Sequence, residues 1–505
     1  MKNIASLLPG ILLLVIGSFQ AVAVEPIPVF RGDYPDPTIV RVGEDYYLTH
    51  TSGYNLPGLF VYHSTNLVDW TLLGPAVETS DIDLLVYAPD IVFHDNKFFI
   101  YFPAAGTNFV VWADKPEGPW SEPIDLKVPH IDPGHLVAED GKRYLYLSGG
   151  NVIELAPDGL STVGELKHVY NGWPIPEDWQ IECHCLESPK LVFKDGYYHM
   201  FSAQGGTTGP PTGHMMVHAR SKNPMGPWEN SPNNPIVRAT SRMENWGMRG
   251  HGTVFDDKDG NWWAIYHAYE KDFKTLGRQN LLEPVKWTKD GWLCVDDDPK
   301  RPQSLAEPQK RAPHAENFTG ESLPMPWFFW YRNFDDPGME FTKDGLVWKA
   351  RGQRIEETNP LLIKASDHSY EIQVDVEIEG KSEAGLLLYY NPANYVGIQL
   401  TDRGYETGLR AGLPQGRTSR SGISRAVLKI RNDANSVEFF FSEDDGKTFT
   451  KIGTGLDVCG FHANTFGGYS SLKPGLSCTG EGKAIFRNFR YTPLTNNSRE
   501  RSEAE

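Results

Sequence analysis

Three carboxylates stand at equivalent places in a recurring sequence pattern: Asp36, Asp132 and Glu187. Each comes just before a short apolar segment, which a turn then separates from an aromatic segment. Asp36 lies between Pro35 and Pro37, which restrict the backbone and remove amide donors, so it suits an ionised general base. Glu187 has a longer side chain and suits a protonated general acid. Such a pair, facing each other across a sugar, is what hydrolysis of a glycosidic bond requires.

The third carboxylate, Asp132, is expected to tune the acid. Glu187 stays protonated only if its pKa is raised, and a negative charge nearby raises it. Glu182 is the alternative acid, but it lies five residues before Glu187 and would face the other way on an extended strand. For any one of these carboxylates taken alone, capping of a turn is an equally good interpretation.

The carboxylates are expected to lie on β-hairpins, because one hairpin-like sequence pattern occurs five times in the chain. A polar residue precedes a strand, a turn such as Asp-Gly follows, and an aromatic strand comes next. The copies repeat at about 40 to 65 residues, which is typical of β-propeller blades. The first strand of each blade lines the axis of a propeller, so the leading polar residues should converge there: Asp36, Asp90, Asp132, Glu187 and His251.

The chain of 505 residues is too long for one core and divides into several parts. Residues 24–298 hold the hairpin repeats, and 299–315 form a polar, proline-rich linker. Residues 316–493 contain alternating strands such as YEIQVDVEIEG, which predict a β-sandwich of jelly-roll type. Residues 494–505 are charged and predict a disordered tail. The fold class is therefore all-β, with a five-bladed β-propeller followed by a β-sandwich.

Residues 1–23 predict an export signal. Lys2 supplies a positive start, Ile11 to Ile16 an apolar core, and Ala21-Val22-Ala23 a small-residue cleavage site. A short membrane anchor is the alternative, but the apolar run is too brief for a span of roughly 20 residues. We expect cleavage after Ala23 and an exported protein, periplasmic or secreted, without membrane insertion.

The charge balance bounds the partners. With 48 Lys and Arg against 65 Asp and Glu, the net charge is −17. Nucleic acids and anionic membranes need basic surfaces, so neither is expected as a partner. A neutral ligand such as a carbohydrate is compatible with this charge. The sequence leaves the oligomeric state open.

The five cysteines are too few for a disulfide scaffold. Cys183 and Cys185 are separated by one residue and are not expected to pair with each other. Together with His184 they resemble metal ligands, but a structural zinc site needs wider spacing and a second ligand pair. Cys459 and Cys478 lie in one predicted domain and could be bridged.

Six motifs of the repeat region together resemble glycoside hydrolase family 43: YPDPTIV, YAPDIVFHDNKFFIYF, IDPGHLV, LESPKLVFKDGYYHMFS, GHGTVF and LGRQNLLEPVKW. The resemblance implies a five-bladed propeller that hydrolyses glycosidic bonds with inversion, mostly in pentose-containing plant polysaccharides. It implies Asp36 as general base, Glu187 as general acid, and Asp132 as the carboxylate that orients the acid and tunes its pKa.

The resemblance also suggests substrate contacts. Arg278, in GRQ, resembles an arginine that touches the sugar in the innermost subsite. We expect Tyr87 and Asp90, in YAPD, and Trp173, in a proline-rich loop, to bind substrate as well. His251 resembles an axial histidine that lies beside a calcium ion, bound through water, or beside a water cluster. The chemistry itself requires no cofactor.

Two departures from the family pattern leave the sugar specificity open. Tyr87 replaces the usual tryptophan of the second motif. The third motif contains DPG, where DPS or DPD is usual. The C-terminal region resembles a concanavalin A-like sandwich, which in many xylosidases of the family lends a loop to the active-site rim. We therefore expect an exo-acting enzyme that releases terminal β-D-xylose or α-L-arabinofuranose. The alternatives are a non-catalytic carbohydrate-binding propeller and an endo-acting arabinanase.

Overall fold

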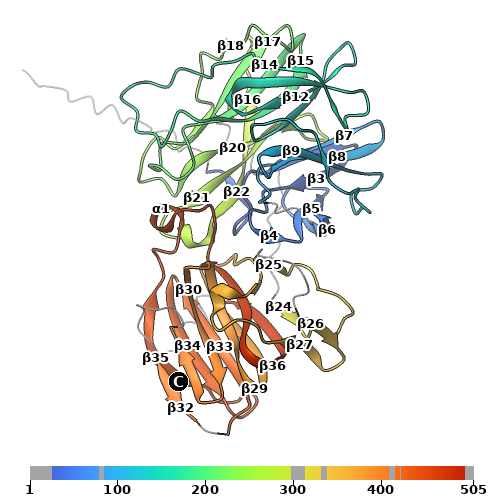
Figure 1. Cartoon of the computed structure of the whole chain (residues 1–505). Helices are drawn as coiled ribbons and strands as arrows, with labels where there is room; N and C mark the ends of the chain where they lie inside the picture. The colour runs from blue at the N-terminus through green and yellow to red at the C-terminus, as the bar shows by residue number, and fades with distance from the viewer. Residues whose placement is uncertain are drawn as a thin grey trace, which may run out of the picture.

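The structure is a computed structural model that describes residues 25–78, 85–296, 313–330, 338–408, 416–420 and 422–494. It consists of a propeller and a sandwich (Figure 1). The predicted export signal lies outside the described residues, as do most of the predicted linker and tail. The last predicted linker residues, 313–315, are described, and two of them belong to strand β24 (His314–Glu316), so the sandwich begins slightly earlier than expected.

Four propeller blades are antiparallel sheets of strands that follow one another in sequence. From the axis outward, their strands are β2 (Thr38–Val42), β3 (Asp45–Thr49), β5 (Gly58–Ser64) and β6 (Thr71–Val77) in blade 1; β7 (Asp90–His94), β8 (Lys97–Ala104), β9 (Thr107–Ala113) and β10 (Ile124–Asp125) in blade 2; β11 (Gly134–Val137), β12 (Arg143–Leu147), β13 (Asn151–Leu155) and β14 (Thr162–His168) in blade 3; and β15 (Leu186–Lys194), β16 (Tyr197–Gln204), β17 (Met215–Ser221) and β18 (Glu229–Asn230) in blade 4, where β19 (Val237–Arg238) also pairs with β17.

The fifth blade closes the ring with a strand from the other end of the domain. Strands β20 (Trp246–Asp256), β21 (Trp262–Glu270) and β22 (Arg278–Trp287) are consecutive. The outer side of β22 then pairs with β1 (Ile27–Phe30) and with β23 (Leu293–Val295). The N-terminal strand therefore completes the last blade.

The five predicted hairpins are confirmed as the first two strands of each blade. Turn chemistry explains them: in blade 4, Asp195 and Gly196 both have positive φ, at 51° and 76°, as a two-residue hairpin turn requires. The first strands contact one another in a closed circle, β2 to β7, β11, β15, β20 and back to β2. Residues at the starts of these strands are thereby brought to the same end of the axis.

The sandwich is built on two long strands, β29 (Ser369–Asn391) and β36 (Lys473–Pro493), which pair along most of their length and run through both layers. The alternation predicted for β29 is confirmed, since Tyr370, Ile372 and Val374 are buried. The other strands are β25 (Phe328–Trp330), β26 (Met339–Thr342), β27 (Gly345–Lys349), β28 (Leu361–Leu362), β30 (Asn394–Thr401), β31 (Gly404–Thr407), β32 (Arg417–Ser419), β33 (Arg425–Asp433), β34 (Ser436–Ser442) and β35 (Thr450–Asp457).

The two domains are joined by backbone pairing. Strand β4 (Asn55–Leu56) of blade 1 pairs with β25 of the sandwich. A sandwich segment that contains helix α1 (Ala463–Phe466) lies against the propeller (Figure 1), and the Asn464 side chain reaches the carbonyls of Thr208 and Gly209.

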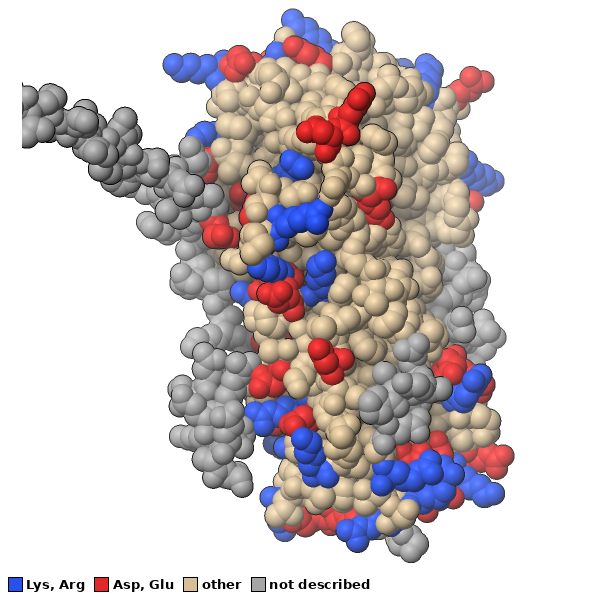
Figure 2. All heavy atoms as spheres, turned by 90° about the vertical axis from the view of Figure 1, so that its left-hand side faces the viewer, with Lys and Arg blue, Asp and Glu red and all other residues tan. Residues whose placement is uncertain are grey.

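The described residues contain no helix long and apolar enough to cross a membrane. Figure 2 shows positive and negative side chains interspersed on the face that it draws.

Candidate active site

Asp36 precedes β2 and has a positive φ of 56°, a conformation that aspartate adopts more readily than most residues. Its carboxylate is buried and has two strong donors. Arg278 Nη1 lies 2.8 Å from Oδ1, and Thr51 Oγ1 donates to Oδ2 at 2.6 Å. Burial alone would raise the pKa of Asp36, but the Arg278 guanidinium and the nearby histidines hold it well below its usual range. Asp36 is therefore an ionised carboxylate near neutral pH.

Two histidines complete the surroundings of Asp36. His267 Nδ1 lies 3.0 Å from Asp36 Oδ1, and its Nε2 lies 2.8 Å from Thr207 Oγ1. His251 Nδ1 lies 3.5 Å from the same Oδ1. Burial lowers the pKa of His251 to about 3, so this ring is neutral. The backbone N–H of Asp36 donates to His267 Nδ1 at 3.2 Å, so this imidazole also helps to fix the backbone of the base.

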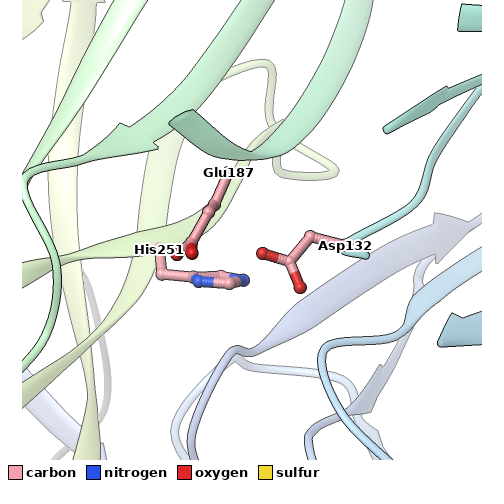
Figure 3. A group of neighbouring side chains, drawn as sticks. All are labelled: Asp132, Glu187 and His251. Atoms are coloured by element: carbon pink, nitrogen blue, oxygen red, sulfur yellow. The ribbon is translucent and has the colours of Figure 1, made fainter. Parts of the chain in front are cut away.

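Glu187 and Asp132 face His251 from neighbouring blades (Figure 3). Glu187 lies on β15, and Asp132 precedes β11 with a φ of 58°. Ligand-type atoms of these three side chains all lie within 4.8 Å of one another. The structure therefore brings Asp132, Glu187 and the axial His251 together at one end of the axis, as the repeat pattern predicts.

The two acids have raised pKa values. Burial, followed by the charge of Asp36, raises the pKa of Glu187 to about 7. Burial, followed by the charges of Glu187 and Asp36, raises the pKa of Asp132 well above its usual range. Two close buried carboxyls titrate as a coupled pair, and the tuning of Glu187 by the charge of Asp132 stays a prediction.

Glu182 does not join this group. Its carboxylate accepts hydrogen bonds from the amide and hydroxyl of Thr208, and its side chain is exposed. The preference for Glu187 over Glu182 as the acid therefore agrees with the geometry.

Asp90 has a different role from the one predicted. Its Oδ1 accepts from Lys190 Nζ at 2.8 Å and from Thr38 Oγ1 at 3.1 Å, and its Oδ2 accepts from the His135 amide at 2.7 Å. The Asp90 and Lys190 side chains are both only 7% exposed. Protein donors thus occupy both oxygens, and the contacts indicate that Asp90 ties blades 1 to 4 together. The repeat pattern correctly predicted that Asp90 lies on the axis. Its carboxylate forms an ion pair with Lys190 there.

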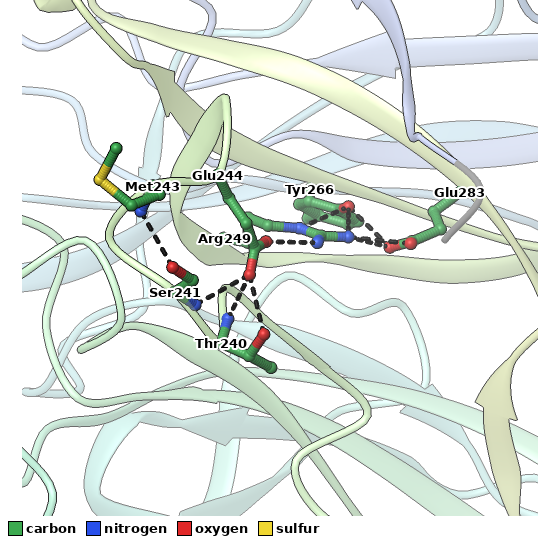
Figure 4. Close-up of polar contacts among 7 residues, drawn as sticks. All are labelled: Thr240, Ser241, Met243, Glu244, Arg249, Tyr266 and Glu283. Atoms are coloured by element: carbon green, nitrogen blue, oxygen red, sulfur yellow. Dashed lines mark hydrogen bonds and ion pairs between the residues drawn. The ribbon is translucent and has the colours of Figure 1, made fainter. Parts of the chain in front are cut away.

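A network in blade 5 positions the strand that carries His251 (Figure 4). Arg249 Nη2 lies 2.7 and 2.8 Å from the two carboxylate oxygens of Glu283 on β22, and 2.8 Å from the Tyr266 hydroxyl on β21. Glu244 approaches the same guanidinium at 3.6 Å and accepts bonds from Thr240 and Ser241. Arg249 thereby fixes the start of β20 beside the axis.

Tyr87 and Tyr469 lie near Arg278, and Tyr54 lies near Tyr87; we call these three residues the tyrosine rim. The ring of Tyr469 lies 5.3 Å from the Arg278 guanidinium and is 48% exposed. Burial, followed by the neighbouring phenols of Tyr54 and Tyr469, raises the pKa of Tyr87. Tyr469 belongs to the sandwich, so both domains contribute to the surroundings of the base.

Trp173 lies in the proline-rich loop before β15 and is half-buried. Its ring packs 5.7 Å from that of Trp179, and its amide donates to Gln204 Oε1 at 2.8 Å. The Arg238 guanidinium lies 3.4 Å from the Trp179 ring. These contacts fix the loop, and substrate stacking by Trp173 stays a prediction.

The expectation that Cys183 and Cys185 do not pair is wrong. Cys183 and Cys185 form a disulfide in the loop that leads to Glu187, because the chain bends enough to bring their Cα atoms to 5.2 Å. This bond leaves no thiolates for a metal at Cys183-His184-Cys185. Cys459 and Cys478 are free, since Cys478 is buried in the sandwich core and Cys459 is exposed.

Several functional residues escape prediction from the sequence. His267 lies within β21 and Thr51 follows the end of β3, and no repeated polar position of the sequence marks either residue. Tyr469 lies in the sandwich and reaches the propeller only through domain packing.

The comparisons with known proteins identify the family of the chain. Residues 26–293, just over half of the chain, match the family described as glycosyl hydrolases family 43. The chain belongs to this family. Residues 315–492 match the β-xylosidase C-terminal concanavalin A-like domain. The chain is therefore a glycoside hydrolase with both domains that the sequence motifs predict.

Curated relatives of this family member carry two activities in their names. The chain is 29% identical to a non-reducing end α-L-arabinofuranosidase of Bacteroides ovatus, over 74% of this chain and 75% of the relative. It is 27% identical to a xylosidase/arabinosidase of Butyrivibrio fibrisolvens, over 93% of this chain and 98% of the relative. A crystal structure of a GH43 protein from Bacillus licheniformis superposes with a TM-score of 0.82 at 26% identity, covering 93% of this chain and 99% of that one.

Proposed function

We propose that this glycoside hydrolase is an inverting exo-enzyme that releases terminal pentose, either β-D-xylose or α-L-arabinofuranose. The observation that carries the proposal is that two buried carboxyls at one end of the axis have opposite surroundings, since Asp36 binds Arg278 and Thr51 whereas Glu187 stands beside Asp132. Arg278 keeps Asp36 ionised, whereas burial and the charge of Asp36 raise the pKa of Glu187 to about 7. One ionised and one protonated carboxyl are what hydrolysis of a glycosidic bond requires, and the inverting outcome follows from the resemblance of the motifs to family 43.

In this mechanism Asp36 accepts a proton from a water molecule that attacks the anomeric carbon. Glu187 gives its proton to the oxygen of the leaving group, and Asp132 takes part in holding that proton beforehand. Arg278 and Thr51 keep the base carboxylate in a fixed orientation. His251 and His267 pack against Asp36 and help to hold it in place.

Exo action is supported by the tyrosine rim, because Tyr469 from the sandwich stands beside Arg278. An endo-acting arabinanase needs an open cleft that lets a polymer pass, so the sandwich loop favours the exo proposal over that alternative. A non-catalytic binding propeller would have no need for separated carboxyl pKa values.

The test is a parallel assay of the purified chain on nitrophenyl β-D-xyloside, α-L-arabinofuranoside and β-D-galactoside, with the product anomer followed by NMR. We expect turnover of at least one pentoside, slow or no turnover of the galactoside, and an initial product of inverted configuration. Internal cleavage of linear arabinan, with products of several sizes, would instead favour the endo-enzyme.

The proposal includes a metal only as a support. Calcium prefers six to eight oxygen ligands. Asp132 and Glu187 offer two carboxyls with raised pKa values, and His251 offers one nitrogen. This donor set does not fit direct coordination, so we propose a hydrated calcium ion that contacts His251 through water. Chelation should then lower the melting temperature more than the activity, and unchanged melting after exhaustive chelation would leave a water cluster there.

We also propose that the chain is exported and cleaved after Ala23, on the strength of its charged, apolar and small-residue N-terminal pattern. Sequencing of the N-terminus of the protein recovered outside the cytoplasm should start at Val24. Recovery of uncleaved chain from the cytoplasm alone would contradict export.

A further inference from the structure

Two lysines of the sandwich reach into the propeller beside the base. Lys473, at the start of β36, is 1% exposed, and its Nζ lies 3.5 Å from Asp33 Oδ2. Lys364, after β28, places its Nζ 3.0 Å from His50 Nε2. Asp33 and His50 are buried residues of the propeller, and each stands one contact away from a residue that binds Asp36.

The first connection ends at Asp36 Oδ1. Asp33 uses its second oxygen, Oδ1, to accept the backbone N–H of Arg278 at 3.2 Å. The Arg278 guanidinium then binds Asp36 Oδ1 at 2.8 Å. Asp33 therefore links Lys473 to the backbone of the residue that keeps the base ionised.

The buried ammonium group of Lys473 holds Asp33 and the start of β36 together. It donates to Ser470 Oγ at 2.8 Å and to the Ser471 carbonyl at 3.3 Å, and Asp33 supplies a negative charge. Removing one member of a buried ion pair leaves the other uncompensated, so the neighbouring backbone must rearrange or admit water. The rearrangement would fall on Arg278.

The second connection ends at Asp36 Oδ2. His50 accepts from the Lys364 ammonium at Nε2, so its proton must be on Nδ1, which donates to the Thr51 carbonyl at 2.7 Å. Burial and the charge of Lys364 lower the pKa of His50 well below its usual value, which agrees with a neutral ring. The Thr51 hydroxyl donates to Asp36 Oδ2 at 2.6 Å.

We infer that Lys473 and Lys364 are positioning residues for the base, through which the sandwich domain fixes the two donors that hold the Asp36 carboxylate. The inference rests on the proposed role of Asp36. The alternative is that the two lysines only stabilise the contact between the domains. Their loss would then lower the melting temperature and leave kcat and the pH profile unchanged.

The pH profile separates these two roles. The groups that face Asp36 are Arg278 from β22, His267 from β21, His251 from β20, and the carboxyls of Glu187 and Asp132. If Arg278 moves away, the pKa of Asp36 rises, because the largest stabilising charge is lost while burial and the other carboxyls remain. The acidic limb of kcat/KM should then move to higher pH.

The experiment uses the full chain with Lys473→Met, which keeps the length of the side chain and removes its charge. We expect kcat to fall about 10- to 100-fold, since a displacement below 1 Å costs up to about 100-fold, with the acidic limb moved to higher pH. Lys473→Arg keeps the charge and should recover most of the activity. Arg425→Met is the matched control, because it breaks the Arg425–Asp375 pair at 2.7 Å within the sandwich, and it should leave kcat and the pH profile unchanged.

Unchanged kcat and an unmoved acidic limb in a folded Lys473→Met variant would overturn the inference, whatever its melting temperature. If that variant does not fold, Lys364→Met decides, because Lys364 is only half-buried; it should show the same two changes at smaller size. Failure of both variants to fold would assign the lysines to folding and overturn the inference. A wild type that hydrolyses no aryl glycoside would refute the proposed function itself, and the two failures are therefore distinguishable.

Discussion

Replacing Glu187 by glutamine tests the assignment of the acid. The change removes the proton donor and keeps the size and polarity of the side chain. General acid assistance is worth about 10²- to 10⁴-fold. We expect a loss of that size on xylo- or arabino-oligosaccharides, whose leaving groups need the proton. Nitrophenyl pentosides, with a good leaving group, should lose much less.

The pKa of Glu187 supplies a second magnitude. With a pKa of about 7, about a tenth of the wild-type molecules keep the proton at pH 8. The wild-type kcat/KM on oligosaccharides should therefore fall about tenfold per pH unit above 7. This alkaline limb should disappear in Glu187→Gln, because the titrating group is gone.

Initial rates over a pH series with both substrate types provide the measurement, and circular dichroism checks the fold. Glu182→Gln, in the loop just before β15, is the matched control. It should keep most activity and shift the alkaline limb slightly to lower pH, because the charge of Glu182 contributes to the raised pKa of Glu187. An alkaline limb that stays in place in Glu187→Gln would refute the assignment. Azide that restores turnover of this variant with a retained product would refute inversion.

The remaining predictions concern the partners of the acid. Asp132→Asn removes a carboxyl whose charge opposes ionisation of Glu187, so the alkaline limb of kcat/KM should move to lower pH. Oligosaccharides should lose more activity than nitrophenyl substrates. An unmoved limb with equal losses on both substrates would leave Asp132 a structural role only. Asp36→Asn should lower kcat at least about 10³-fold on both substrate types with the fold intact, because base assistance is needed whatever the leaving group, and near-normal rates would contradict its role. Cys183→Ser should lower the melting temperature measured by calorimetry by no more than a few degrees. The disulfide closes a loop of only three residues, and its loss costs about 1.6 kcal/mol of chain entropy. A drop beyond about 10 °C would contradict this.

Local patterns predicted the hairpins and the residues that lead them. Period-two alternation and turn residues are set by near neighbours in sequence, so the five first strands and the position of Asp36, Asp132, Glu187 and His251 on the axis followed from them. The same logic placed Asp90 there, and it does lie at the start of β7.

Long-range pairing was beyond these patterns. Nothing near Asp90 indicates that Lys190, two blades away, neutralises it. The raised pKa values of Asp132 and Glu187 depend on their separation and burial, which only the closed ring determines. Tyr469 and Lys473 act across a domain boundary, where sequence distance carries no information about contact.

The closure of blade 5 by β1 bears on the order in which the chain can assemble. During synthesis β1 emerges first, yet its partner β22 follows roughly 250 residues later, so the circle can close only after nearly the whole propeller has been made. Until then β1 is an unpaired edge that other strands could join. Capture of β1 by β22 is therefore a late event, and a bulky fusion placed directly before β1 would interfere with that step more than one attached after the sandwich.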